Sequence, residues 1–239
     1  HPDWKGKSAN GPYGDVVEEL DGRIGDLLKV LKDEELEKNT IVVFMSDNGT
    51  EPGQRKWGSG EPFRGLKWSA LEGGTRVPCI LRFPKVIPAG EVTDKLTTAI
   101  DLLPTLAGAC GIRLKEGPGI VPKLDGLNLW ESLQGKTKTH PRKSLLYWHG
   151  WAMPQAIRVG DFKLYLDKVK EIPGSNKGPV LIDLSKDPAE EKDLASKYPE
   201  KVKDMKALAE KLLSEIEENS MPLGGPARKG ERKTGHWLK

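Results

Sequence analysis

The sequence predicts an α/β protein: a sheet flanked by helices in its first part, and a small antiparallel sheet with a packed helix in its last part. Three observations lead to this prediction. Apolar residues recur at helical spacing near the start of the chain, a fully apolar run follows them, and four short alternating segments precede a second amphipathic stretch. With 239 residues, the chain is long enough to bury a substantial core.

The first part is expected to contain one long helix and two strands. The helix follows Gly11–Asp15, and its apolar face carries Val16, Val17, Leu20, Ile24, Leu27, Leu28 and Leu31. The run Thr40–Met45 then predicts a buried strand, and Val77–Phe83 predicts a second one, which Pro84 closes. Because helix followed by parallel strand is the repeating unit of a doubly wound sheet, we expect parallel pairing here.

The middle of the chain is expected to be a helical segment and a long connection. Leu96–Cys110 predicts a helix interrupted at Pro104, where a second helix begins with Asp101 near its start. The following stretch is rich in Gly, Pro and Lys and has little periodicity. We therefore place a connection at residues 116–143, between a first domain at 1–115 and a second at 144–239.

The last part is expected to be a four-stranded antiparallel sheet with one helix and a basic tail. The predicted strands are Ser144–Trp148, Ala156–Val159, Phe162–Leu166 and Val180–Leu184. Gly160-Asp161 is a hairpin turn between the second and third. Pro199–Glu218 predicts a helix with an apolar face formed by Val202, Met205, Leu208, Ala209, Leu212, Leu213 and Ile216.

Composition excludes several classes of function. The 38 basic and 35 acidic residues are interleaved and leave a net charge of +3, so we expect no nucleic-acid partner. No apolar run approaches the length of about 18 residues that a membrane span needs. Two cysteines do not make a disulfide framework, and Cys79 and Cys110 are both expected to be buried small hydrophobic residues.

The most informative motif is Asp47-Asn48-Gly49, directly after the first apolar strand. Strand ends are where open α/β sheets place their ligands. A carboxylate and an amide oxygen side by side are hard donors, which suit calcium or magnesium better than zinc. The alternative is that the three residues are only good turn formers.

The residues that follow this turn carry a resemblance. Lys67 stands five residues before Glu72 in the stretch Lys67-Trp68-Ser69-Ala70-Leu71-Glu72-Gly73-Gly74-Thr75-Arg76-Val77-Pro78. Further matches follow in order at Thr98–Leu106, Ala156–Leu164 and Leu181–Glu190. This succession resembles the later part of the sulfatase family, and in particular arylsulfatases and N-acetylgalactosamine-6-sulfatases, which implies an alkaline-phosphatase-like sheet.

The resemblance implies roles for individual residues. Asp47 and Asn48 would be metal ligands, for Ca²⁺ rather than Mg²⁺, and Lys67 would be a catalytic residue that binds the sulfate group. His149 would lie near the substrate mouth, although half-buried surface histidines are commoner. The substrate would be a sulfated carbohydrate or an aryl sulfate, and the compartment periplasmic, secreted or lysosome-like.

Other residues of the same loops have two interpretations each. Gly73 and Gly74 are expected to serve backbone geometry, and Arg76 a structural ion pair, with substrate binding as the alternative. Trp57 and Trp68 fit stacking on a sugar or aryl group, and they fit core packing equally well.

The family nucleophile is a formylglycine made from the first residue of a Cys/Ser-x-Pro-x-Arg motif. Neither Cys79 nor Cys110 lies in that motif, and the acidic pair of metal ligands is missing. We therefore expect these residues to be the later portion of a longer enzyme, inactive alone, with the nucleophile upstream. The alternatives are a phosphoester or phosphonate hydrolase of the same superfamily, and a noncatalytic remnant that binds sulfated glycans.

Overall fold

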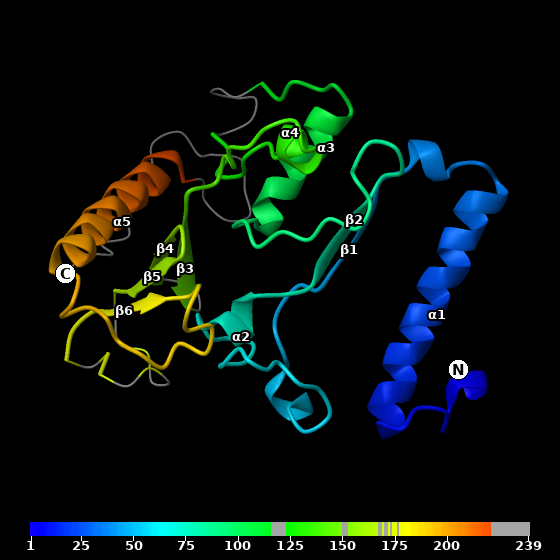
Figure 1. The fold of residues 1–239 in the computed structure, drawn as a ribbon, viewed down its shortest axis with the longest axis horizontal. Helices are drawn as coiled ribbons and strands as arrows, with labels where there is room; N and C mark the ends of the chain where they lie inside the picture. Colours follow the sequence, from blue (N-terminus) through cyan, green and yellow to red (C-terminus); the bar gives the residue numbers. More distant parts are fainter. Residues whose placement is uncertain are drawn as a thin grey trace.

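The computed structural model describes residues 1–115, 123–149, 153–166, 169, 172, 174–175 and 177–220. The beginning of the predicted connection, residues 116–122, and the basic tail lie outside the described residues. Figure 1 shows two regions joined by a central loop: a first region with the long helix α1 and a two-stranded sheet, and a four-stranded sheet covered by the helix α5.

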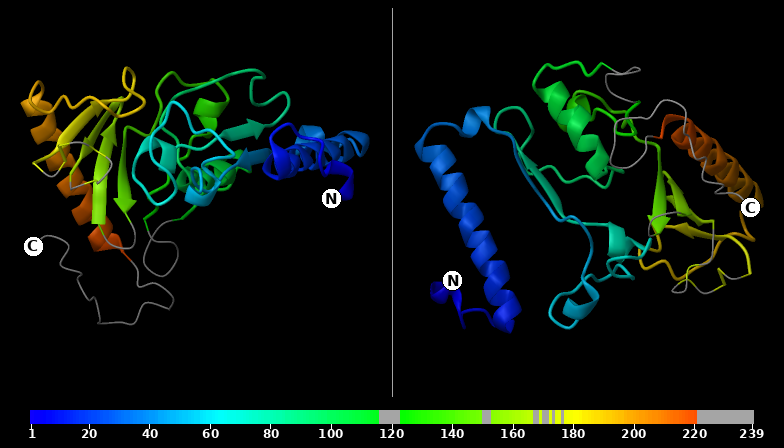
Figure 2. Two further views of the ribbon diagram at one scale, coloured as in Figure 1. Left: turned by 90° about the horizontal axis from the view of Figure 1, so that it is seen from below. Right: turned by 180° about the vertical axis from the view of Figure 1, so that it is seen from behind.

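The first region begins with a short 3₁₀ helix, η1 (Pro2–Trp4), and the predicted long helix, α1 (Gly11–Asp33). In Figures 1 and 2, α1 stands apart from the rest of the molecule. Its apolar residues are exposed: Val16 shows 66% of its surface, Leu20 52% and Leu27 59%. The amphipathic helix is confirmed, but its apolar face is only partly covered by the other described residues, with Ile24, Leu28 and Leu31 half-buried.

Two short strands follow α1 and the 3₁₀ helix η2 (Glu37–Asn39). They are β1 (Val42–Met45) and β2 (Cys79–Arg82), close to the predicted positions. The prediction of parallel pairing is wrong for them, because they pair antiparallel, with Val42 opposite Arg82 and Met45 opposite Cys79. The chain leaves β1 into one long loop and returns directly beside it. Parallel pairing would need a crossover connection, which this loop does not make.

The prediction that both cysteines are buried is also wrong, because the free thiols of Cys79 and Cys110 are both in exposed residues. Cys79 begins β2, whose first two residues are exposed. No second layer of the described residues covers this end of the two-stranded sheet. Cys110 is the C-cap residue, directly after the helix α3 (Leu102–Ala109).

The middle segment contains a 3₁₀ turn, η4 (Ala99–Asp101), the helix α3 (Leu102–Ala109) and the single turn α4 (Trp130–Leu133). As predicted, Asp101 lies at the helix start, where it forms a capping box with Thr98, and Pro104 lies in the first turn. The prediction of a helix from Leu96 that is interrupted at Pro104 is wrong: residues 96–98 are not helical, and α3 continues through Pro104 because an amide in the first turn has no partner to lose. Asp101 also accepts a hydrogen bond from Nε of Arg142 at 2.9 Å, which ties α3 to the chain entering the second sheet.

The second region is the four-stranded sheet that the alternating segments predict. Its strands are β3 (Ser144–His149), β4 (Met153–Val159), β5 (Phe162–Tyr165) and β6 (Val180–Asp183), antiparallel in the order β3-β4-β5-β6. Gly160-Asp161 forms the predicted turn between β4 and β5, and Gly160 has a φ of +57° there. The helix α5 (Pro199–Asn219) follows.

Each face of this sheet is covered by a different part of the chain (Figure 2). Met205 and Ala209 of α5 pack against one face, on Leu146, Ile157, Leu164 and Leu181. The other face receives Ala70 and Leu71, both fully buried, from the loop between β1 and β2. That loop also contains η3 (Pro52–Gln54) and the one-turn helix α2 (Glu72–Thr75). None of the helices in the described residues has the length and apolar character needed to span a bilayer.

Candidate functional site

The Asp47-Asn48 turn presents two oxygen donors at the end of β1. Asp47 is exposed and Asn48 partly exposed. Within the described residues, neither side chain has a hydrogen bond or ion pair, whereas the backbone oxygen of Asn48 accepts from Oγ of Ser46 at 2.9 Å. The turn is therefore braced through its backbone, and both side-chain donors remain available for a ligand.

Two backbone hydrogen bonds join this turn to the loop that carries Lys67. The amide of Lys67 donates to the carbonyl oxygen of Thr50 at 2.9 Å, and the amide of Gly49 donates to that of Gly74 at 3.0 Å. Residues separated by about twenty positions in the sequence are thus held side by side. The structure brings the two predicted parts of the site, the turn and the lysine loop, into one assembly.

Glycine is required where these segments touch. A Cβ atom added to Gly49 would lie 1.9 Å from the carbonyl oxygen of Gly73, and one added to Gly73 would lie 2.4 Å from that of Arg64. Such distances are far inside van der Waals contact. The expectation that the Glu72-Gly73-Gly74 segment serves backbone geometry is confirmed, with Gly49 as its partner.

The Lys67 side chain is about one-third exposed, and its charge has a local partner. Its Nζ atom lies 3.1 Å from Oε2 of Glu51 and 5.2 Å from the centre of the Trp68 ring. Trp68 itself is 72% exposed and has a φ of +78°, a conformation that bulky residues rarely adopt. Core packing therefore does not explain Trp68, and its ring and the Lys67 ammonium lie next to each other on the loop.

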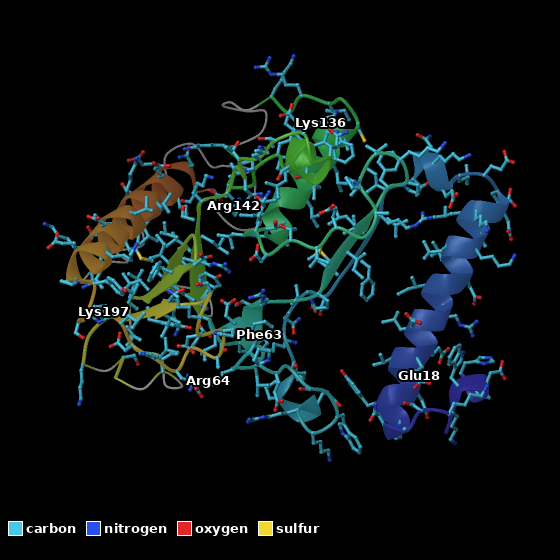
Figure 3. All side chains as sticks on the ribbon, viewed as in Figure 1. Glu18, Phe63, Arg64, Lys136, Arg142 and Lys197 are labelled. Atoms are coloured by element: carbon cyan, nitrogen blue, oxygen red, sulfur yellow. The ribbon has the colours of Figure 1, made fainter. Side chains whose placement is uncertain are left out.

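Arg76 lies beside a carboxylate and an aromatic ring, as a residue with a structural role would. Its Nη1 atom lies 3.7 Å from Oε2 of Glu72, and its guanidinium stands 4.6 Å from the centre of the Phe63 ring. Figure 3 labels Phe63 on the loop beside the second sheet. Both contacts lie within the loop, so Arg76 helps to shape it.

His149 is the last residue of β3, paired with Met153 of β4. Its side chain lies outside the described part of the structure. Its role at the substrate mouth stays a prediction.

The donor set of the turn fits part of a calcium site. Calcium takes six to eight oxygen ligands, and a carboxylate next to an amide oxygen are two of the types it prefers. No group of three or more His, Cys, Asp and Glu side chains among the described residues is arranged to hold a metal. Asp47 and Asn48 could thus hold the ion only together with further ligands.

The chemistry of Cys79 does not favour a role as nucleophile. Although the residue is exposed as a whole, partial burial of its sulfur raises the pKa of the Cys79 thiol, which lowers the fraction of reactive thiolate at neutral pH. Its thiol side chain also lies on β2 and not in the loop with Lys67.

A buried ionic cluster next to the lysine loop was not predicted from the sequence. Nζ of Lys163, on β5, lies 2.9 Å from Oε1 of both Glu72 and Glu190, and all three side chains are almost fully buried. The guanidinium of Arg64, also labelled in Figure 3, donates to the backbone oxygen of Glu190 at 3.1 Å. The sequence feature that could have indicated this cluster is Lys163 itself, a lysine at an inward-facing position of the otherwise apolar strand β5.

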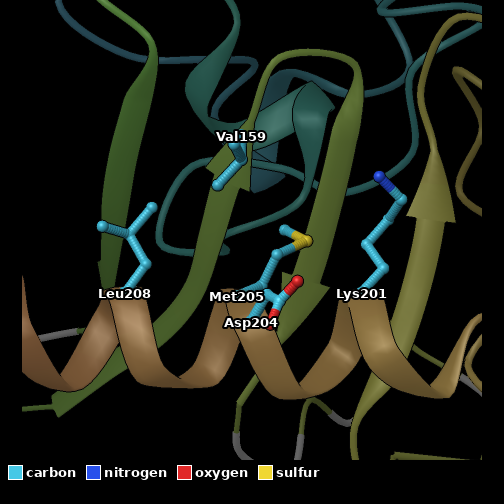
Figure 4. A pocket seen from close by; sticks show the side chains of 5 residues that line it. All are labelled: Val159, Lys201, Asp204, Met205 and Leu208. Carbon is cyan, nitrogen blue, oxygen red and sulfur yellow. The ribbon is translucent and has the colours of Figure 1, made fainter.

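A pocket of about 320 Å³ lies elsewhere, between α5 and β4 (Figure 4). It is lined by Val159, Lys201, Asp204, Met205 and Leu208. Val159 and Met205 belong to the core on the α5 side of the sheet, whereas the lysine loop packs on the other side. This pocket is therefore separate from the candidate site.

Two family profiles match the chain. The family profile described as Sulfatase matches residues 3–112, and the profile described as N-sulphoglucosamine sulphohydrolase, C-terminal, matches residues 67–220. The two overlap at residues 67–112, which include the later part of the lysine loop, β2 and α3.

Among curated proteins, the chain is 34% identical to human steryl-sulfatase over 222 residues, which is 80% of this chain and 37% of that protein. The chain also superimposes on a solved structure from the metabolism of multiple glycosaminoglycans by Bacteroides thetaiotaomicron. The TM-score is 0.75 and the identity 31%, over 90% of this chain and 47% of the other.

A third similar protein was solved in complex with its substrate, D-glucosamine-2-N,6-O-disulfate. There the TM-score is 0.63 and the identity 27%, over 87% of this chain and 41% of that one. The chain spans less than half the length of each of these relatives. The structural similarity confirms the expected α/β fold class, with the sheet of the first part and the smaller sheet and helix of the last part.

Proposed function

Because the chain belongs to the sulfatase family, we propose that it forms one part of the active site of a calcium-dependent sulfuric ester hydrolase. The observation that supports this most directly is the hydrogen-bonded assembly of the Asp47-Asn48 turn with the Lys67 loop. It holds two hard oxygen donors and a flexible ammonium group on adjoining segments, which is what an anionic ester and a metal ion need.

Lys67 is proposed to bind the sulfate group and to neutralise charge on it during cleavage. In the structure its ammonium pairs with Glu51, and the two side chains are 31% and 49% exposed. An exposed ion pair contributes only about 0–1 kcal/mol. Lys67 can therefore exchange Glu51 for a sulfate group at little cost.

Asp47 and Asn48 are proposed to hold the metal ion with ligands from outside this chain. A bound calcium ion would act as a Lewis acid on the sulfate oxygens. The turn would orient its two donors through the backbone bracing by Ser46 and Gly49.

The nucleophile is proposed to be a formylglycine on a part of the sulfatase that these 239 residues do not include. We assign no residue of this chain to that role, and we expect the chain to be inactive alone. The protein that combines residues 1–239 with the nucleophile segment is called the complete sulfatase below. Its compartment is proposed to be periplasmic, secreted or lysosome-like, in keeping with the family.

The substrate class is proposed to be a sulfated carbohydrate, with aryl sulfates as simpler substrates. The exposed Trp68 ring next to Lys67 supports this, because a flat aromatic surface beside a sulfate-binding charge can stack on a sugar or aryl ring. The similarity to a protein solved with a disulfated glucosamine supports it as well.

The reaction type is tested by comparing 4-nitrophenyl sulfate with 4-nitrophenyl phosphate as substrates of the complete sulfatase. We expect the sulfate ester to have the higher kcat/KM and chelation of calcium to abolish its turnover. A preference for the phosphate ester would assign the chain to the phosphoester hydrolases of the same superfamily.

Replacement of Lys67 by alanine tests the residue assignment. We expect kcat/KM for the sulfate ester to fall by roughly 10²-fold or more, because a charge that meets the transition state is lost. The matched control is Lys56→Ala, which removes an ammonium that stands 4.9 Å over the Trp57 ring in the same loop. Equal kinetics of the two variants would remove Lys67 from the site.

A further inference from the structure

The buried ionic cluster lies directly behind the lysine loop, and its lysine is surrounded by three oxygen atoms. Lys163 has no exposed surface. Its Nζ atom contacts Oε1 of Glu72 and Oε1 of Glu190, each at 2.9 Å, and donates to the carbonyl oxygen of Ala70 at 2.6 Å. The contacts with Ala70 and Glu72 are hydrogen bonds, and the contact with Glu190 is an ion pair.

The two glutamates are linked to each other as well, through the backbone of Glu72. The backbone amide of Glu72 donates to Oε2 of Glu190 at 2.8 Å, and the hydroxyl of Tyr165 donates to Oε1 of Glu190 at 2.5 Å. Burial raises the pKa of Tyr165, so its hydroxyl remains a donor throughout the neutral range. We refer to Lys163, Glu72, Glu190 and Tyr165 as the Lys163 cluster.

The Lys163 cluster holds the loop on both sides of Lys67. On the side that follows, Lys163 binds the oxygen of Ala70 and the carboxylate of Glu72, three and five positions after Lys67. On the side that precedes, the guanidinium of Arg64 donates to the backbone oxygen of Glu190 at 3.1 Å. The short segment between these attachments contains the partly exposed Lys67 side chain.

Apolar packing alone would not hold this segment in one position. Ala70 and Leu71 fill the core under the loop, but apolar contacts are non-directional. Buried ion pairs contribute little net stability compared with apolar residues of similar volume, because desolvation opposes their attraction. Their hydrogen bonds are directional, however, and tie named atoms of the loop to named atoms of β5.

We infer that the Lys163 cluster is a positioning device for the candidate site, which fixes where the Lys67 ammonium meets the sulfate group. Lys163, Glu72 and Glu190 are then positioning residues and do not touch the substrate. This inference rests on the proposed function, because it needs Lys67 to bind sulfate. It gives the four-stranded sheet a role in catalysis, although the sheet itself supplies none of the groups proposed to react.

The test uses Glu190→Gln in the complete sulfatase, which removes one charge of the cluster and preserves the side-chain shape. We expect kcat/KM for the sulfate ester to fall roughly tenfold or more, because small displacements of a positioned group are costly. Inhibition by inorganic sulfate should weaken in the same variant. Kinetics are measured at 15 °C, and circular dichroism at that temperature establishes that the variant is folded.

The matched control is Asp101→Asn, which breaks the buried ion pair with Arg142. The side chains of that pair are 1% and 8% exposed, so it is as buried as the Lys163 cluster, but it ties α3 to the entrance of β3 and does not touch the lysine loop. We expect Asp101→Asn to lower the melting temperature without changing KM or the inhibition by sulfate.

A second variant, Tyr165→Phe, removes only one hydrogen bond to Glu190. This variant tests the positioning role if Glu190→Gln does not fold. A twofold or larger loss of sulfate affinity in this variant supports the inference. Unchanged kinetics in the folded variants, with only the melting temperature lowered, would overturn it. If Lys67→Ala also leaves turnover unchanged, the proposed function fails; if Lys67→Ala abolishes turnover, only the positioning role fails.

Discussion

The helices α1 and α5 have the same kind of amphipathic pattern and opposite surroundings. Val16 and Leu27 on the apolar face of α1 are 66% and 59% exposed, whereas Met205 and Ala209 on that of α5 are 4% and 1% exposed. The pattern therefore identifies a helix and the face that can be buried, but it does not identify the partner. For α5 the partner is the adjacent sheet; for α1 the described residues leave Val16, Val17, Leu20 and Leu27 exposed.

The two sheets differ in the same way. The four-stranded sheet is covered on both faces, by α5 and by Ala70 and Leu71, whereas Ile80 on the two-stranded sheet remains 61% exposed. Large exposed apolar surfaces commonly mark contact sites. The candidate site lies on the loop between the regions, and that loop is anchored in the region with the complete core.

The largest effect is expected from removing apolar volume in the covered region. Leu71→Ala should lower the free energy of unfolding of the 239-residue chain by about 2–5 kcal/mol, because Leu71 is fully buried. Leu27→Ala, on the exposed face of α1, should change it by less than about 0.5 kcal/mol. Urea denaturation of both variants measures the contrast, and equal losses would show that α1 is packed after all.

An intermediate effect is expected where the two regions meet. In Gly49→Ala the new Cβ would lie 1.9 Å from the oxygen of Gly73, so the turn and the loop must separate. We expect a loss of about 1–3 kcal/mol. Gly53→Ala, where nothing lies within 4 Å of the added atom, is the control and should be nearly neutral. A melting temperature of Gly49→Ala equal to that of the control would contradict this close contact.

The smallest effect is expected at the start of α1. Asp15 accepts hydrogen bonds from the amides of Gly6, Lys7 and Ser8, which lower the pKa of its carboxyl group. Because the folded-state pKa is below the unfolded value, this anchor stabilises the fold above about pH 4 and is lost as pH falls through the folded value.

Amide exchange followed by NMR measures this anchor. The amides of residues 6–8 should exchange faster in acid, and in Asp15→Asn already at neutral pH, while those of β5 stay unchanged. Acid-insensitive protection of residues 6–8 would show that another contact fixes this segment.

Much of the fold follows from local pattern. The four strands of the second sheet, their hairpin at Gly160-Asp161 and the face of α5 were all predictable, because alternation and helical spacing report burial on a neighbouring element. The direction of β2 relative to β1 was not predictable. Strand pairing depends on the path of the long loop between Met45 and Cys79, and that loop has no periodicity. The prediction that both cysteines are buried failed for a related reason, because apolar neighbours in the sequence do not guarantee that another layer covers them.

The candidate site was only partly predictable. Motif order identified the Asp47-Asn48 turn and Lys67, and the structure joins them through the backbone. The metal, the nucleophile and the role of His149 stay predictions. The Lys163 cluster was missed because Glu72 lies 91 residues from Lys163 and 118 from Glu190 in the sequence, and a single lysine in a strand does not reveal its partners.

The attachment of the Lys67 loop to β5 has a consequence for hybrid enzymes. A chimera that takes its C-terminal sheet from one relative and its lysine loop from another would separate the ammonium of Lys163 from the acceptors that it was matched to, Ala70 and Glu72. Residues 64–74 and β5 should therefore be exchanged together, because their contacts make them one structural unit.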